Sequence, residues 1–99
     1  MNRRQVFVTD DLYANLDDHL GDERGPNGEP SRFDFLRFEL IEIIDQIAVE
    51  FDELPEAIPG HPYYRLLVIE GRMVDQIAVV GHLAPDGSIE LVHLDLNFK

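Results

Sequence analysis

The N-terminal part of the chain changes from a strand-like to a helical pattern of apolar residues. Residues 5–9 are β-branched and aromatic at their centre, which predicts a short strand. Leu12, Leu16 and Leu20 follow at intervals of four, and this spacing places them on one face of a helix. Residues 9–11 supply capping side chains and negative charge for the start of that helix. We therefore predict a strand followed by a short helix.

The longest periodic segment begins at Ser31, which forms an approximate capping box with Asp34. Apolar residues then recur at steps of mostly three and four, and Pro55 ends the pattern. This repeat predicts one long helix, joined to the first by the glycine- and proline-rich loop of residues 22–30. The apolar arc of this helix, which we expect to pack on a sheet or on another helix, consists of Phe33, Leu36, Leu40, Ile43, Ile44, Ile47, Phe51 and Leu54.

The C-terminal part is predicted to form three strands, at residues 63–70, 73–83 and 88–98, in an antiparallel meander. Turn-forming residues separate these strands. In the last strand, strict alternation assigns the side chains to two faces. One face holds Val92, Leu94, Leu96 and Phe98, and the other holds Ile89, Leu91, His93, Asp95 and Asn97. Since the second set becomes polar toward its end, we expect that face to meet solvent or a partner.

These elements predict a single α+β domain over residues 1–99. Two helices pack on a four-stranded, mainly antiparallel sheet, and the elements follow the order β-α-α-β-β-β. A chain of 99 residues is long enough to bury one hydrophobic core. Two helices cover one face of such a sheet, so we expect its other face to be partly open.

The charge balance narrows the classes of partner. Twenty acidic residues against eight lysines and arginines give a formal net charge of −12. Between Asp10 and Glu53 there are fourteen carboxylates and three arginines, which gives 3 − 14 = −11 for this stretch. Such a surface repels phosphate backbones, so direct binding of free nucleic acid is not expected, and it attracts a basic partner. The alternative is that the excess acid only keeps a small protein soluble.

Several kinds of site and location are not expected from the composition. The chain has no cysteine, so it has no disulfide and no thiolate metal ligand. It has no apolar run of membrane-spanning length, and residues 6–8 are too short for the apolar part of a signal peptide. Its glycines match no nucleotide-binding pattern. We expect a cytoplasmic protein with no membrane partner and no cofactor.

Three residues of the predicted sheet are candidates for catalysis. If Arg65, His82 and His93 lie on one side, they form a polar cluster in which Asp95 orients a histidine. An arginine that binds a phosphate and a histidine that exchanges a proton are the minimum for phosphodiester cleavage. The alternative is that both histidines are ordinary surface residues. A turn after Leu83 places His82 nearer to residues 88 or 90 than to His93, so no metal site is expected.

A second candidate site binds a macromolecular partner. Phe35, Phe38 and Val49 fall opposite the main apolar arc of the long helix, on a side that is otherwise acidic. Exposed aromatic residues in such a place are typical of a docking patch. Further candidate contacts are Tyr63, Tyr64 and Arg72. The alternative is that the loop or the first helix covers the aromatic residues, and self-association into a homodimer is a sub-case of docking.

Four short segments follow one another in an order that is also found in a known protein family. A strand leads into the helix at residues 9–12, and a proline-containing stretch follows the second helix at residues 54–60. Arg65 opens the next strand, and residues 86–91, Asp-Gly-Ser-Ile-Glu-Leu, introduce the last one. In element order and spacing, nearly the whole chain resembles the RelE/ParE toxins of bacterial toxin–antitoxin modules.

The resemblance implies a toxin that an antitoxin protein neutralises. Members of the family inhibit growth through ribosome-dependent mRNA cleavage or through gyrase inhibition, so the ribosome and gyrase are the implied targets. Arg65 matches the arginine that opens a strand in the family. Nucleases of the family are usually basic, whereas this chain has no lysine before Lys99. The alternative function is a small acidic inhibitor, of the immunity or phage type, that masks a basic surface of a macromolecular target.

Overall fold

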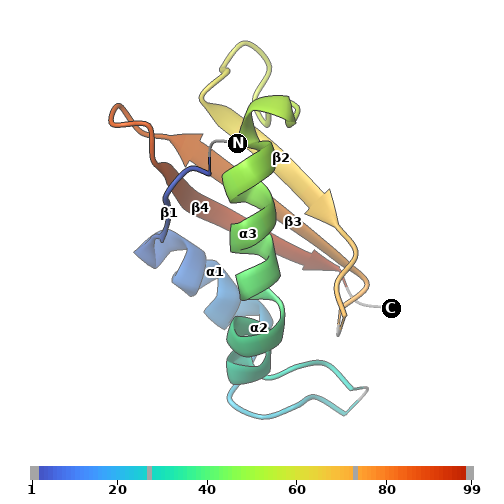
Figure 1. Cartoon of the computed structure of the whole chain (residues 1–99). Helices are drawn as coiled ribbons and strands as arrows, with labels where there is room; N and C mark the ends of the chain where they lie inside the picture. The colour runs from blue at the N-terminus through green and yellow to red at the C-terminus, as the bar shows by residue number, and fades with distance from the viewer. Residues whose placement is uncertain (1–2, 27, 73, 98–99) are drawn as a thin grey trace.

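The fold combines three α-helices with one four-stranded sheet (Figure 1). The computed structural model describes residues 3–26, 28–72 and 74–97, and these counts refer to those residues. The expected α+β class is confirmed. In chain order the elements are β1 (Val6–Val8), α1 (Asp10–His19), α2 (Arg32–Phe38), α3 (Leu40–Glu50), the 3-10 helix η1 (Phe51–Glu53), β2 (Tyr64–Ile69), β3 (Gln76–Leu83) and β4 (Ile89–Asn97).

The sheet is mixed, with strand order β1-β4-β3-β2. The predicted meander is present, because β3 pairs antiparallel with both β2 and β4. The first strand differs from a purely antiparallel arrangement, since Val6 to Val8 pair in parallel with Ile89 to Leu91. A parallel pair requires a long crossover between its strands, and the three helices with the β2–β3 hairpin supply that connection.

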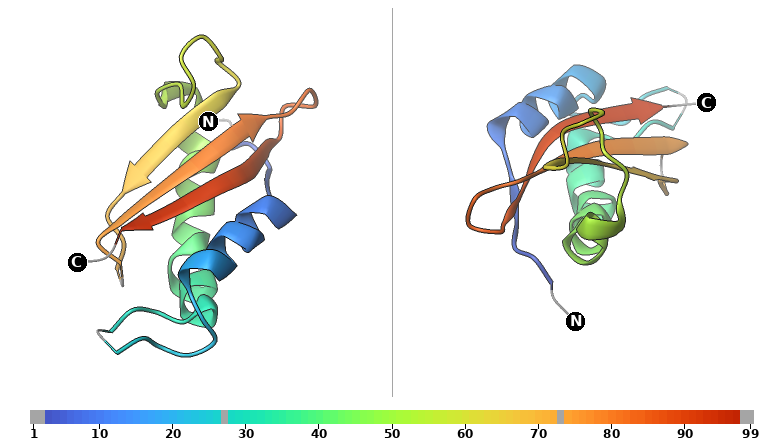
Figure 2. Two further views of the ribbon diagram at one scale, coloured as in Figure 1. Left: turned by 180° about the vertical axis from the view of Figure 1, so that it is seen from behind. Right: turned by 90° about the horizontal axis from the view of Figure 1, so that it is seen from above.

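The helices and the sheet enclose one core. Figure 2 shows α3 across one face of the sheet, whereas no helix lies over β2 and β3 on the opposite face. The first helix packs along β4, where the side-chain oxygen of Asn15 accepts a hydrogen bond from the Leu94 N–H at 3.1 Å. At Gly81 the sheet and α3 come close, because an added Cβ would lie 2.9 Å from the Ile47 side chain. The largest fully buried side chains include Phe35, Phe51, Leu12, Leu16, Ile43, Ile47, Ile77, Ile89, Leu91 and Leu94.

The prediction of one long second helix is wrong. The capping box at its start is confirmed, since the Ser31 hydroxyl accepts from the Asp34 N–H and the Asp34 carboxylate accepts from the Ser31 N–H. The α-helical segment is interrupted at Glu39, where φ is −107°, and α3 ends at Glu50 before the 3-10 turn. The region therefore holds two α-helices, and with α1 they make three rather than the two expected.

A buried carboxylate lies at the interruption. Glu39 is only 2% exposed, and its two oxygens accept the backbone N–H of Arg72 at 2.8 and 3.0 Å. Gly71 leaves room for this carboxylate, because an added Cβ would collide with it. The row of buried side chains on α2 and α3 therefore runs through residues 35, 39, 43 and 47, whereas the predicted apolar arc began at Phe33. Phe35, predicted to be exposed, has no exposed surface, whereas Phe33 is 65% exposed.

The predicted strict alternation of the last strand is wrong, because β4 contains a β-bulge. Val80 pairs with His93, but Gly81 pairs with Leu91, so Val92 is an extra residue in β4. Because of this extra residue, the side chains that face the core are at odd-numbered positions before the bulge and at even-numbered positions after it. Apolar residues on both sides of the bulge consequently face the core, namely Ile89, Leu91, Leu94 and Leu96. The polar residues His93, Asp95 and Asn97 are exposed, as predicted.

None of the helices in the described part of the chain combines the length and the apolar character needed to cross a bilayer. The longest α-helix, α3, has 11 residues, and about 20 are needed to span the hydrocarbon core.

Candidate functional site: an apolar and acidic stripe on two helices

The strand register sorts the side chains of the sheet onto two faces. Cross-strand partners point to the same side of a sheet, so each row of partners shares one face. On the face covered by α3, the rows are Arg65–Gly81–Leu91, Leu67–Val79–Leu94 and Ile69–Ile77–Leu96. On the opposite, open face, the rows are Tyr64–His82–Glu90, Leu66–Val80–His93 and Val68–Ala78–Asp95. Arg65 therefore lies across the sheet from His82 and His93, and the predicted cluster of these three residues is not formed.

Arg65 is bound to backbone carbonyls near the end of the helical segment. Its Nη1 donates to the carbonyl oxygen of Leu54 at 2.8 Å and to that of Asp52 at 3.4 Å. Its Nε donates to the carbonyl oxygen of Pro62 at 2.6 Å. The guanidinium carbon lies 5.9 Å from the centre of the Phe51 ring. These contacts give Arg65 a structural role, because its donors already satisfy the carbonyls that follow α3.

The two histidines have separate surroundings on the open face. Nδ1 of His82 lies 3.0 Å from Oε1 of Glu90, as the predicted position of the hairpin requires. His93 is exposed, and Asp95, which was expected to orient a histidine, lies 3.3 Å from Nε2 of His19. Within the described residues, no group of three or more histidine, cysteine or acidic side chains is placed to hold a metal ion.

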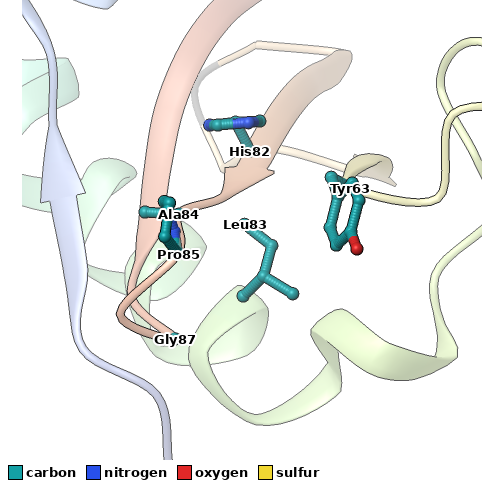
Figure 3. Close-up of a pocket in the computed structure, with 6 residues that line it drawn as sticks. All are labelled: Tyr63, His82, Leu83, Ala84, Pro85 and Gly87. Carbon is teal, nitrogen blue, oxygen red and sulfur yellow. The ribbon is translucent and has the colours of Figure 1, made fainter.

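An open pocket of about 430 Å³ lies beside His82, where β2 begins and the β3–β4 hairpin turns (Figure 3). The lining is mostly apolar and consists of Tyr63, His82, Leu83, Ala84, Pro85 and Gly87. The Tyr64 ring stacks on His82, with 4.6 Å between the ring centres. These lining residues include no lysine, arginine or carboxylate. The lining therefore offers no guanidinium or ammonium group to bind a phosphate.

A row of exposed side chains runs along the outside of α2 and α3. It consists of Phe38, Ile41, Asp45 and Val49, and we call it the outer stripe. The spacing i, i+3, i+7, i+11 keeps these residues on one side of a helical segment. The two helices lie nearly end to end (Figure 1), so the interruption at Glu39 does not divide the stripe. Phe38 is 41% exposed, Ile41 57% and Val49 45%.

Carboxylates at and beside the outer stripe are paired with arginines from other parts of the chain. Arg3 forms an ion pair with Asp45, in the middle of the stripe. Arg4 reaches both oxygens of Asp52 at 3.1 Å, and Arg72 forms an ion pair with Glu42. Two further carboxylates of this region, Glu50 and Glu53, make no ion pair within the described residues. The surface therefore combines exposed apolar side chains with one paired carboxylate, Asp45, among them and with further carboxylates beside them.

The outer stripe contains two of the predicted partner contacts and adds two others. Phe38 and Val49 lie on it, whereas Phe35 is in the core. Ile41 and Asp45 were not predicted as partner contacts, although their spacing from Phe38 was present in the sequence.

The remaining predicted partner contacts lie elsewhere. Tyr63 is 60% exposed at the pocket, and Tyr64 stacks on His82 on the open face. Arg72 lies between β2 and β3, where its backbone and guanidinium bind carboxylates of Glu39 and Glu42.

Comparison of the chain with protein-family models, with curated proteins and with solved structures gives no match. The chemistry of the outer stripe is therefore inferred from its geometry and charge alone.

Proposed function

We propose that this protein acts by binding a basic protein through the outer stripe, without a chemical step. In this function it is a small acidic inhibitor that masks a basic surface of a macromolecular target. The observation that carries the proposal is the exposed row of Phe38, Ile41 and Val49 with Asp45 among them. Apolar anchors with a charged rim are characteristic of protein interfaces, and a net charge of −12 accelerates the encounter with a basic partner.

The distribution of the polar residues supports binding rather than catalysis. Phosphodiester cleavage requires a phosphate-binding group and a proton-transfer group that reach the same atom. Arg65 and the histidines lie on opposite faces of the sheet, and Arg65 is occupied by backbone carbonyls. The phosphate backbone of RNA would also be repelled by the acidic surface.

A toxin of the RelE/ParE type is the second candidate function. Element order favours it, because a short strand, helices and a three-stranded meander follow one another as the resemblance implies. Of the two family activities, gyrase inhibition fits better than mRNA cleavage, since Arg65 and the histidines do not meet. The main partner would then be an antitoxin protein.

Tightly induced expression in a bacterial host distinguishes the two functions. Growth is followed while total RNA and plasmid topology are examined in parallel, with soluble protein confirmed in every culture. An acidic inhibitor whose target is absent from the host leaves growth, mRNA and plasmid topology unchanged. Growth arrest with cleaved mRNA or with gyrase-dependent DNA breaks would contradict the inhibitor function and establish the toxin.

A further inference from the structure

The outer stripe has the dimensions of a helix-docking surface. Phe38 and Val49 are eleven positions apart, which corresponds to about 16 Å along a helix axis, or three turns. An amphipathic helix presents apolar residues at the same spacing of three and four. Such a helix can therefore place its apolar residues against Phe38, Ile41 and Val49 in register.

The charge of the surface specifies the partner. Asp45 lies between Ile41 and Val49 at steps of four. To its sides or beyond it lie Glu42 and Asp52, which are paired with Arg72 and Arg4, and Glu53, which makes no ion pair within the described residues. Of the two arginines of α2, Arg37 is the one next to the stripe in sequence, and its guanidinium carbon lies 5.3 Å from the centre of the Phe38 ring. A second copy of this chain would bring another net charge of −12 to the same surface. Electrostatic repulsion disfavours that copy and favours a basic partner helix.

The free protein already places one cation at the centre of the stripe. Arg3, which precedes β1, forms an ion pair with the Asp45 carboxylate. Both side chains are more than half exposed, at 54% and 60%, so water competes with the pair and it is weak. Arg4 is held more firmly, since it also binds the Gly87 carbonyl and its backbone N–H donates to Ala48. Arg3 can therefore leave Asp45 while Arg4 keeps the segment in place.

We propose that the outer stripe binds a basic amphipathic helix of the partner protein, and that Arg3 occupies in the free protein the position of a cation of that helix. This inference rests on the proposed function and adds its regulation. On binding, an arginine or lysine of the partner replaces Arg3 at Asp45 while the apolar side chains of both helices come into contact. Arg3 is then a competitor within the chain, and its removal strengthens binding.

Calorimetric titration with a synthetic peptide tests the proposal. The probe is a 21-residue helical peptide with leucines at heptad spacing on one face, an arginine among them and lysines beside them. The control peptide has the same composition in scrambled order. The full chain is compared with the variants Arg3→Ala, Asp45→Asn, Ile41→Gln and the double variant Arg3→Ala/Asp45→Asn. Asp18→Asn is the matched control, because Asp18 is an exposed acid of α1 that makes no ion pair within the described residues.

The expected pattern has opposite signs at the two ends of the ion pair. Arg3→Ala tightens binding of the helical peptide about two- to five-fold, and Asp45→Asn weakens it by a similar factor. In the double variant the gain from Arg3→Ala disappears, because the cation site is absent. Ile41→Gln weakens binding on the order of ten-fold, whereas Asp18→Asn has little effect.

Three outcomes would overturn the proposal. If Arg3→Ala leaves the affinity unchanged while Ile41→Gln and Asp45→Asn weaken it, the competitor role is wrong and the docking function stands. If both peptides bind equally and Asp18→Asn acts like Asp45→Asn, the attraction is unspecific and the proposed function fails as well. If sedimentation shows a dimer of the free chain that Ile41→Gln dissolves, the stripe pairs with a second copy rather than with a basic helix.

Discussion

Arg65 shows at the scale of one residue how hydrogen bonds determine a role. Its side chain points to the face of the sheet covered by α3, where it meets carbonyl oxygens of residues 52, 54 and 62. Carbonyls at the end of a helical segment lack partners within the helix, and a guanidinium is well suited to satisfy several of them. The sequence identified Arg65 as important, but it did not indicate toward which face the side chain points.

Replacing Arg65 by alanine is expected to destabilise the fold. The variant leaves three carbonyl oxygens without their donor, and we expect a loss of about 1–3 kcal/mol in the free energy of unfolding. Chemical denaturation measures this loss. The control is Arg72→Ala, which removes an exposed ion pair with Glu42 and keeps the backbone bond to Glu39. We expect the control to change stability by less than about 1 kcal/mol. Equal losses in the two variants would contradict the structural role.

At the scale of an element, the capping box at the start of α2 makes the stability of the folded state depend on pH. The Asp34 carboxylate accepts hydrogen bonds from Nε of Arg24 at 2.8 Å and from the backbone N–H of Ser31. The bond from Arg24, followed by that from Ser31, holds the pKa of Asp34 below its usual value. The ionised carboxylate therefore stabilises the folded state. This stabilisation is complete above the pKa of Asp34 in the unfolded chain, and it is lost as pH falls through the lower folded pKa.

Replacing Asp34 by asparagine is expected to remove this pH dependence. At pH 7 the variant melts at a lower temperature than the original chain, because asparagine cannot form the charge-assisted bond with Arg24. As pH falls through the folded pKa of Asp34, the difference in Tm decreases toward zero. Thermal unfolding between pH 7 and pH 2, followed by circular dichroism, measures it. Asp18→Asn is the control, and a Tm difference for Asp34→Asn that stays constant with pH would refute the linkage.

Sequence periodicity predicted which helices and strands form better than it predicted which of their side chains face the core. The capping box of residues 31–34 and the β3–β4 hairpin depend on local chemistry, and both are confirmed. The apolar pattern did not reveal two places where the period changes, at Glu39 and at Val92. The buried Glu39 depends on a backbone N–H of Arg72, which is distant in sequence. The extra residue Val92 depends on pairing with β3. In both cases a tertiary contact shifted the period and moved predicted residues to the other face.

At the scale of the whole molecule, charge and uncovered surface are the two properties on which the proposed binding function rests. Fourteen acidic residues lie between Asp10 and Glu53, the stretch that includes the three α-helices of the described residues. The acidic balance was readable from the sequence, because composition does not depend on folding. The exposed anchors were predicted only in part, since Ile41 and Asp45 join Phe38 and Val49 once the side chains around Glu39 have been placed. The site is thus a product of fold and composition.

The most direct test of the central claim is nuclear magnetic resonance of the ¹⁵N-labelled chain during titration with the basic amphipathic peptide. The outer stripe as docking surface predicts saturable shifts of backbone amides concentrated between Phe38 and Val49, with smaller changes near Arg3. Shifts concentrated in the row of Tyr64, His82 and Glu90, or spread evenly over all acidic segments, would contradict the account. The first of these results would move the binding site to the open face of the sheet, and the second would leave only unspecific attraction between opposite charges.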